Sequence, residues 1–124
     1  MKREQRLRSA ADLRRAREAA PRAWSHPLLV LYVASNDLSP PGIRVGVTVS
    51  RRVGKAVVRN RVRRRIREAV RRLLPRVRAR RDLLFIARPA SATAEWADLR
   101  QAIERLLAQA GLIEDAPATA VAHV

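Results

Sequence analysis

The sequence predicts a single small α+β domain in which helices pack against one sheet. Its 124 residues are enough for one modest hydrophobic core. Residues 43–50 alternate strictly between apolar and polar or small side chains, which is the period of a strand. Residues 56–74 instead repeat apolar side chains every four positions, which is the period of a helix. With the flanking segments, the predicted order is helix, strands, helix, strand, helix, in a domain spanning residues 1–113.

The first predicted element is a short helix. Ser9-Ala-Ala-Asp12 resembles a capping box with Asp in place of Glu, so a helix should run from about Ala10 to Ala19. Leu13 and Ala16 form its thin apolar face, and Pro21 stops it.

Two strands follow, separated by the turn-rich loop 36–42. Residues 28–34, LLVLYVA, predict a strand whose dense apolar character suggests that both of its faces are covered. In residues 43–50 one face would carry the apolar set Ile43, Val45, Val47 and Val49. The other face would carry Arg44, Gly46, Thr48 and Ser50. These side chains are small or polar enough to admit a ligand backbone, although a plain solvated face would show the same alternation.

The second half of the domain predicts helix, strand and helix. Gly54 is the hinge before helix 56–74, which Pro75 terminates. The helix buries the stripe Val58, Val62, Ile66, Val70, Leu73 and Leu74. About 100° around its axis lies the ladder Arg59, Arg63, Arg67 and Arg71.

Residues 82–88, DLLFIAR, read as a central strand, which could complete a βαβ unit with strand 43–50 and helix 56–74. A last helix, from about Ala94 to Ala110, would be capped by Thr93 or a neighbour and ended by Gly111. Its buried face would be Trp96, Leu99, Ile103, Leu106, Leu107 and Ala110. The Ala/Pro-rich residues 114–124 predict a disordered tail.

Charge is the strongest functional signal. The formal net charge is +16, and 11 of the 22 residues in 51–72 are Arg or Lys. Like charges four residues apart on a helix cost a few tenths of a kcal/mol per pair, so such a segment indicates a polyanionic partner. A GC-rich genome could explain the choice of Arg over Lys, but it does not explain the net charge. Nucleic acid is favoured over an anionic membrane surface, because the single narrow apolar stripe should be consumed by the core.

Catalysis by protein side chains is poorly supported. The chain has no cysteine, two histidines and 11 scattered acidic residues, with no spacing typical of a metal site or a catalytic triad. We therefore predict no catalytic residue and no metal ligand. The longest apolar run, Leu28 to Ala34, is far too short for a membrane span, and no signal peptide is visible.

Residues 44–72, RVGVTVSRRVGKAVVRNRVRRRIREAVRR, closely resemble the signature of the bacterial ribonuclease P protein subunit. That signature joins an R-x-G-x-x-V-S-[KR]-[KR]-x-G strand and loop to a helix that opens A-V-x-R-N-R. About ten positions agree at fixed spacing, and the flanking helix and strands fit over roughly residues 6–112. The resemblance implies an α-β-β-β-α-β-α topology with a four-stranded sheet and an unusual left-handed βαβ crossover.

The resemblance also implies a function. The partner, ribonuclease P RNA, would be the catalyst and would remove the 5′ leader of precursor tRNA by Mg²⁺-assisted hydrolysis. The protein would bind that RNA and hold the leader. We expect it to act in the cytoplasm, with no membrane and no small-molecule substrate involved. The implied RNA-binding residues are Arg51, Arg52, Lys55, Arg59, Asn60, Arg61, Arg63, Arg64 and Arg67. Tyr32 and Thr48 fall where the family lines its leader cleft.

The first helix departs from the family pattern, which often places two Phe residues in that cleft. Leu13 takes the first position, and the second falls near Arg17. We therefore expect aliphatic and electrostatic contacts with the leader there. The alternative function is that of another basic RNA-binding protein, such as a ribosomal protein or an RNA chaperone, with no role in tRNA processing.

Overall fold

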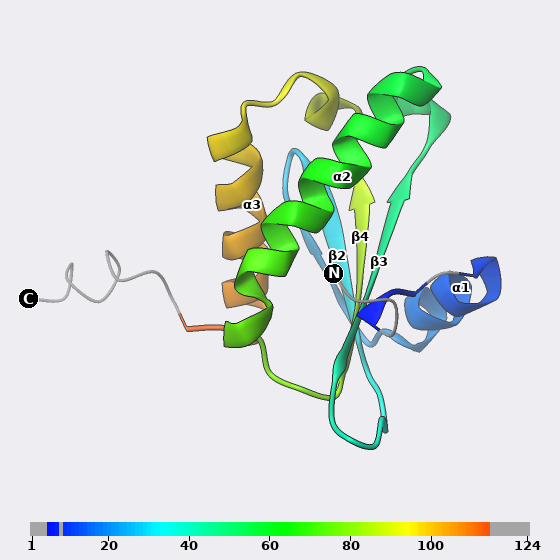
Figure 1. The fold of residues 1–124 in the computed structure, drawn as a ribbon, viewed down its shortest axis with the longest axis vertical. Helices are drawn as coiled ribbons and strands as arrows, with labels where there is room; N and C mark the ends of the chain where they lie inside the picture. The colour runs from blue at the N-terminus through cyan, green and yellow to red at the C-terminus, as the bar shows by residue number, and fades with distance from the viewer. Residues whose placement is uncertain (1–4, 8, 115–124) are drawn as a thin grey trace, which may run out of the picture.

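The computed structural model describes residues 5–7 and 9–114, so most of the predicted tail lies outside the described residues. The described residues form three α-helices and a four-stranded sheet (Figure 1). In chain order the elements are α1 Ala10–Ala19, β1 Ala23–Ser25, β2 Leu29–Ser35, β3 Ile43–Val49, α2 Ala56–Leu73, β4 Arg81–Ala87 and α3 Trp96–Gln109. Short 3₁₀ turns occupy Arg51–Val53, Leu74–Arg76 and Pro89–Thr93. The α+β class and the topology expected from the resemblance are confirmed.

The sheet has the strand order β1-β2-β4-β3, so β4 lies between two strands that precede it in the chain. It pairs antiparallel with β2 and parallel with β3. In Figure 1 both β3 and β4 run upward, α2 lies in front of the sheet, and β4 is to the left of β3. This is a left-handed βαβ crossover, an exception to the usual right-handed rule.

One face of the sheet forms the hydrophobic core together with α2 and α3. It carries the buried side chains Leu29, Leu31, Val33, Val45, Val47, Val49, Leu83, Phe85 and Ala87. From α2 the core takes Val62, Ile66, Ala69, Val70 and Leu73, and from α3 it takes Leu99, Ile103, Leu106 and Leu107. The strict alternation of β3 and the four-residue repeat of α2 therefore point their apolar sets at the same layer, as predicted.

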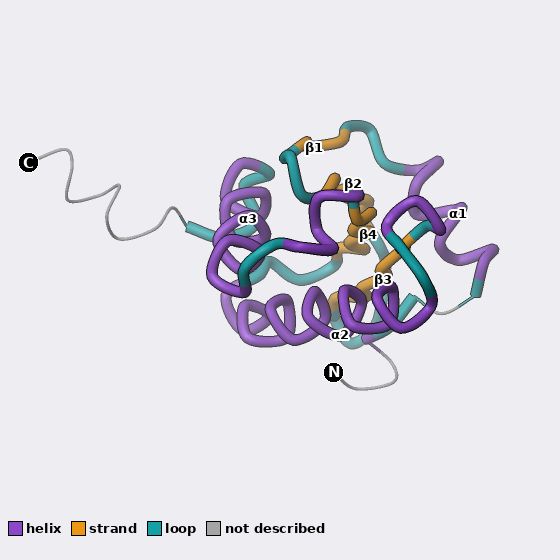
Figure 2. Tube along the Cα trace, turned by 90° about the horizontal axis from the view of Figure 1, so that it is seen from above, coloured by secondary structure: helices purple, strands orange, loops and turns teal. Residues whose placement is uncertain are grey.

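The other face of the sheet is only partly covered. Figure 2 shows α1 on the opposite side of the sheet from α3. On this face Val30 and Tyr32 are only half-buried, so the expectation that both faces of this strand are covered was wrong. Dense apolar sequence hides the alternation here, because Val and Tyr are tolerated on an exposed strand face.

Gly46 of β3 is buried by the protein's own side chains and does not admit a ligand. A Cβ atom on Gly46 would come 2.3 Å from Leu13 Cδ2 and 3.1 Å from Leu7 Cβ. The missing side chain thus provides the space into which the thin apolar face of α1 packs. The N-terminal segment also joins the sheet edge, where the Leu7 amide donates to the Val45 carbonyl at 2.8 Å.

Element boundaries differ from prediction in three places. The three-residue β1 is too short to show a period, and only the family resemblance implied it. Pro75 lies inside the 3₁₀ turn after α2, so the helix ends two residues before it. Thr93 does not cap α3, because the turn Pro89–Thr93 ends there and the cap position falls on Glu95.

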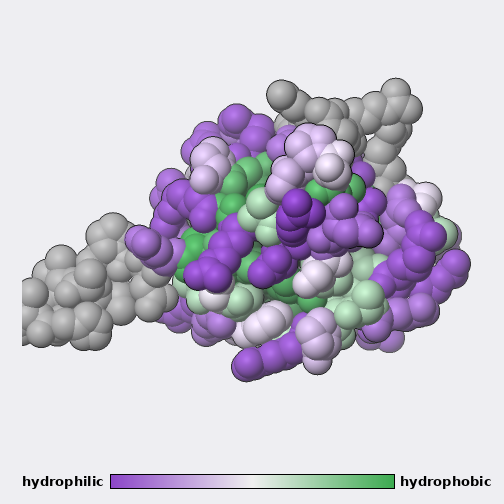
Figure 3. Space-filling view, turned by 90° about the horizontal axis from the view of Figure 1, so that it is seen from below, coloured by the Kyte–Doolittle hydropathy of each residue, from purple (hydrophilic) through white to green (hydrophobic). Residues whose placement is uncertain are grey.

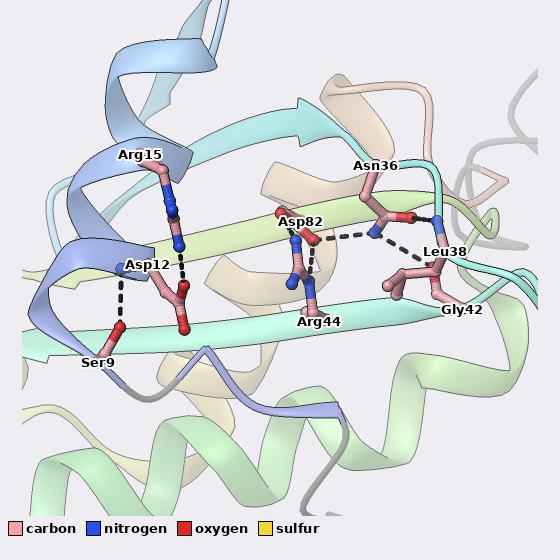
Figure 4. A network of polar contacts seen from close by, with 8 residues as sticks. All are labelled: Ser9, Asp12, Arg15, Asn36, Leu38, Gly42, Arg44 and Asp82. Carbon is pink, nitrogen blue, oxygen red and sulfur yellow. Dashed lines mark hydrogen bonds and ion pairs between the residues drawn. The ribbon is translucent and has the colours of Figure 1, made fainter.

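Polar contacts fix the ends of α1 and of the loop after β2 (Figure 4). Ser9 accepts a hydrogen bond from the Asp12 amide at 3.0 Å, as the capping box predicts, while Asp12 pairs with Arg15. Asn36 donates to Asp82 at 2.9 Å and accepts from the Leu38 amide at 3.2 Å. The loop is therefore tied to the central strand β4.

Candidate nucleic-acid interface

The charged side chains of α2 divide into two flanks on either side of its buried stripe. The stripe of Val62, Ile66, Ala69, Val70 and Leu73 faces the core. One flank faces α3 and the turn before it, and the other lies toward the N-terminal segment. Both follow from the 100° step of an α-helix, which spreads a run of arginines around the axis.

The flank toward α3 is occupied by contacts within the protein. Arg61 donates to the Ala92 carbonyl at 3.1 Å, and Arg65 donates to the Ala94 carbonyl at 2.9 Å. The Arg72 guanidinium lies 5.6 Å from the centre of the Trp96 ring. Arg61, a predicted RNA-binding residue, therefore already has a structural contact.

The opposite flank carries cations without carboxylate partners. Arg59, Arg63 and Arg67 are each half-buried, and no ion pair among the described residues involves them. Burial, followed by the nearby charges of Arg6 and Arg63, lowers the pKa of Arg67. The Nε atom of Arg59 is buried without a hydrogen-bond partner in the described part of the chain. Bringing these charges together costs free energy that a bound polyanion would recover.

A hollow of about 360 Å³ lies between this flank and the N-terminal segment, and it is lined by Arg6, Arg64, Arg67, Glu68 and Arg71. Arg6 was not among the predicted site residues. It reaches the helix because its segment bridges to Val45 on the edge of the sheet. No local sequence pattern could reveal that contact, since residue 6 and residue 67 meet only through the tertiary fold.

Glu68 is the one carboxylate on α2. It accepts hydrogen bonds from Arg71 at 2.6 and 3.0 Å and from Arg72 at 3.2 Å. The hydrogen bond from Arg71 is the largest cause that lowers the pKa of Glu68, from its ordinary value of 4.5 to about 2. Glu68 therefore offsets part of the positive charge near the C-terminal end of α2, whereas the N-terminal part of the flank keeps its full charge.

The start of α2 adds unpaired donors to this surface. Lys55 occupies the N-cap position and provides no side-chain cap, so the first amides of the helix are open to an anion. Arg51 and Arg52 are exposed just before it. Gly54 has φ 153°, and a Cβ there would lie 3.0 Å from a methyl group of Val58. This close approach explains why glycine turns the chain into the helix.

Asn60 faces outward beside these cations and accepts a hydrogen bond from Arg63 Nη1 at 2.8 Å. The bond fixes Arg63 while its remaining N–H groups stay available. Most of the predicted RNA-binding residues thus share one side and one end of α2, with Arg61 on the other side. Their contact with RNA stays a prediction.

The half-open sheet face brings together the predicted leader-cleft residues Leu13, Tyr32 and Thr48. The strand register aligns Tyr32 with Leu84 and Gly46 in one row across the sheet. The next row is Val30, Ile86 and Thr48, all half-buried. Leu13 covers the first row from α1, whereas the second remains accessible. Figure 3 views the molecule from below, toward the lower end of Figure 1. Hydrophilic side chains surround most of this end, and hydrophobic side chains gather between them.

The described residues contain no group of three or more His, Cys, Asp or Glu side chains arranged to hold a metal ion. No helix within residues 5–7 and 9–114 is long and apolar enough to cross a membrane.

The fold and the cationic helix together define a small basic nucleic-acid-binding protein. The family model described as Ribonuclease P matches residues 1–111. The ribonuclease P protein component of Herpetosiphon aurantiacus is 47% identical over 115 residues, which cover 93% of this chain and 91% of that protein. The same component of Roseiflexus castenholzii is 43% identical over 117 residues, covering 94% and 93%.

The chain therefore belongs to the ribonuclease P protein family. As its protein component it is part of the ribonucleoprotein enzyme that processes tRNA, and its partner is ribonuclease P RNA. The fold agrees with solved structures. The Staphylococcus aureus RNase P protein superimposes with a TM-score of 0.78 at 24% identity, covering 89% of this chain and 98% of that one. The Thermotoga maritima protein gives 0.74 at 24% identity, covering 84% and 96%.

Proposed function

We propose that the cationic flank and N-terminus of α2 bind ribonuclease P RNA, and that the half-open sheet face binds the 5′ leader of precursor tRNA. The carrying observation is that the cationic flank lies beside the N-terminal segment at the β3 edge of the sheet, whereas the half-open face lies beside α1. In Figure 2, α2 runs along the β3 edge, with α3 on one side of the sheet and α1 on the other. One small domain can therefore hold the catalyst and the substrate strand at the same time.

Phosphate contacts would supply most of the affinity for RNA. The unpaired cations of the flank, Arg59, Arg63, Arg64 and Arg67, would each release counterions from the RNA on binding. Recognition by phosphates and shape fits a chain with few aromatic residues, because single-stranded base recognition usually needs exposed rings. The protein would position its partners and contribute no general acid or base.

We place the Mg²⁺ ions of the reaction on the RNA. The described residues offer no carboxylate cluster to hold a divalent cation, and the surrounding arginines repel one. The protein would favour these ions indirectly, by neutralising phosphates that otherwise repel the substrate. We place the complex in the cytoplasm, as expected for an enzyme that matures tRNA.

The test is reconstitution. The full chain is mixed with a bacterial ribonuclease P RNA and precursor tRNA at low Mg²⁺, and cleavage of the 5′ leader is followed. We expect the wild-type protein to raise the cleavage rate, whereas RNA alone stays slow. No increase at any protein concentration would contradict the proposed function.

The leader contact needs a second comparison. Substitutions of Tyr32 and Thr48 should weaken binding of precursor tRNA to the holoenzyme more than binding of mature tRNA. Arg105→Ala is a suitable control, because Arg105 is exposed and belongs to α3, which lies on the other side of the sheet from α1. Equal effects of Tyr32→Leu on both RNAs would remove the sheet face from leader binding.

A further inference from the structure

Arg17 occupies the boundary between the covered and the open part of the sheet face. Its guanidinium carbon lies 5.3 Å from the centre of the Tyr32 ring. Arg17 is on the last turn of α1 and is exposed, and none of the ion pairs or hydrogen bonds of the described residues involves its guanidinium. Its charge is therefore held in place by an aromatic ring and remains unpaired.

Stacking leaves this cation able to bind. A cation–π contact is an attraction between the positive charge and the ring face, and it does not require the N–H donors of the guanidinium. Five N–H donors lie in the plane of the group. They are arranged as a fork that matches two oxygens of a phosphate. Tyr32 thus orients Arg17 without consuming its hydrogen-bonding capacity.

The position is next to the accessible row of the sheet. Val30 lies two residues from Tyr32 on the same face of β2, about 7 Å away. Val30, Ile86 and Thr48 form a floor that is apolar except for one hydroxyl, with no ring for a base to stack on. Arg17 covers the Tyr32 ring from the α1 side, so that ring is already engaged. A strand crossing this floor would find a cation where a stacking platform would otherwise be.

We propose that Arg17, oriented by Tyr32, is a phosphate-binding residue that positions the 5′ leader independently of its base sequence. This inference rests on the proposed function, since it needs the leader to cross the open sheet face. It changes the role of Tyr32 from a base-stacking surface to a support for a cation. Contact with a phosphate in place of a base predicts tolerance of different leader sequences.

The experiment measures binding of leader-bearing precursor tRNA and of mature tRNA to the reconstituted holoenzyme as salt is varied. Arg17→Ala should reduce the affinity advantage of the precursor by about fivefold, the upper range for a solvent-exposed ion pair. It should also lower the slope of log affinity against log salt by about 0.7, the value for one phosphate of a single strand. Mature tRNA should bind unchanged.

Arg14→Ala is the matched control. Arg14 has the same charge and lies on the same helix, is exposed, and stacks on none of the described rings. It should leave both the affinity and the salt slope of the precursor as in the wild type. Thermal melting of each variant checks that α1 stays folded.

Variants of Tyr32 test the positioning role. Tyr32→Phe keeps a ring beneath Arg17 and should retain leader affinity, whereas Tyr32→Leu should lose as much as Arg17→Ala. The double variant Arg17→Ala/Tyr32→Leu should lose no more than either single change, because the two residues act as one unit. A precursor with an abasic leader should show the same loss on Arg17→Ala.

The alternative of base stacking gives opposite results. If Tyr32 receives a base, Arg17→Ala frees the ring and leaves leader affinity equal or higher, which would overturn the inference. A salt slope of precursor binding that is the same for Arg17→Ala and Arg14→Ala would also overturn the inference. In both cases the wild-type protein would still stimulate cleavage by the RNA, so the proposed function would stand. Failure of that stimulation would instead reject the proposed function.

Discussion

Arg44 and Asp82 face each other on the neighbouring strands β3 and β4 and form a two-point ion pair. Arg44 Nε donates to Asp82 Oδ1 at 2.9 Å, and Arg44 Nη2 donates to Oδ2 at 2.7 Å. Asp82 is 6% exposed, and the hydrogen bonding that Arg44 donates to this carboxylate is the largest cause that raises the pKa of Arg44. The pair joins the parallel strands at the end where α1 covers the sheet.

Removing either partner should destabilise the protein. Asp82→Ala leaves Arg44 and Asn36 without their acceptor, and Arg44→Ala leaves a buried carboxylate with less compensation. Each should lower the free energy of unfolding by about 1–3 kcal/mol, measured by denaturant titration. The double variant should lose less than the sum, because the second change removes the group left unpaired. Arg15→Ala breaks the exposed pair with Asp12 and should cost much less, because solvent screens this pair. Strict additivity at Arg44 and Asp82 would contradict the coupling.

Gly46→Ala should displace α1 from the sheet. The new Cβ would collide with Leu13 and approach Leu7. Overpacking of this kind costs about 1–3 kcal/mol, again read from denaturant unfolding. Leu13→Ala in the same chain should restore part of the loss by making room. Gly42→Ala is the control, since its Cβ would meet Leu38 at an ordinary 3.6 Å. Equal effects at both glycines would show that lost backbone freedom dominates, and not the contact with α1.

Arg63 and Arg65 should differ although both are half-buried on α2. Arg63→Ala should reduce the salt slope of binding to ribonuclease P RNA by about one unit, as expected for one phosphate contact. Arg65→Ala should leave that slope nearly unchanged and lower stability instead, because Arg65 holds the Ala94 carbonyl. Filter binding across a salt series and thermal melting distinguish the two. A reduced slope for Arg65→Ala alone would reverse the assignment of the flanks.

The ion pairs of Glu68 should add stability at neutral pH that is lost in acid. The pKa of Glu68 is lowered in the folded protein from 4.5 to about 2 by Arg71 first and Arg72 next. A lowered folded pKa contributes stability above the unfolded value of 4.5, and that stability disappears as pH falls toward 2. The stability difference between wild type and Glu68→Gln should therefore be largest above pH 4.5 and shrink below it.

Glu18→Gln provides the control for this pH series. Glu18 is exposed on α1, and the ion pairs of the described residues do not include it. A stability gap for Glu68→Gln that stays constant between neutral and acidic pH would show that the ion pairs contribute little. A gap of the same size for Glu18→Gln would show a general charge effect.

Local sequence patterns predicted the helices and strands well where apolar side chains recur at one regular spacing. The alternation of β3 and the four-residue stripe of α2 gave both elements within a residue or two, and the Ser9 cap located α1. The start of α3 was also predicted within two residues, but the contacts of Arg61 and Arg65 with the turn before it were not. Such contacts join residues about thirty positions apart and leave no local signature.

The site was predictable in part. Helical phase placed the arginines of α2 beside a buried stripe, but it could not say which flank the rest of the protein covers. That depends on where α3 and the N-terminal segment pack, so neither the contact of Arg61 with Ala92 nor the place of Arg6 beside the flank could be predicted. Arg17 was located by its departure from the family pattern, whereas its contact with Tyr32 required the tertiary structure.

The insertion of β4 between β2 and β3 has a consequence for biosynthesis. Strands β2 and β3 are consecutive in the chain, yet they do not pair with each other. Until β4 has left the ribosome, each of them has an edge of backbone N–H and C=O groups whose partner does not yet exist. The sheet therefore closes late, and a nascent chain halted before β4 lacks the central strand and leaves two strand edges open to aggregation.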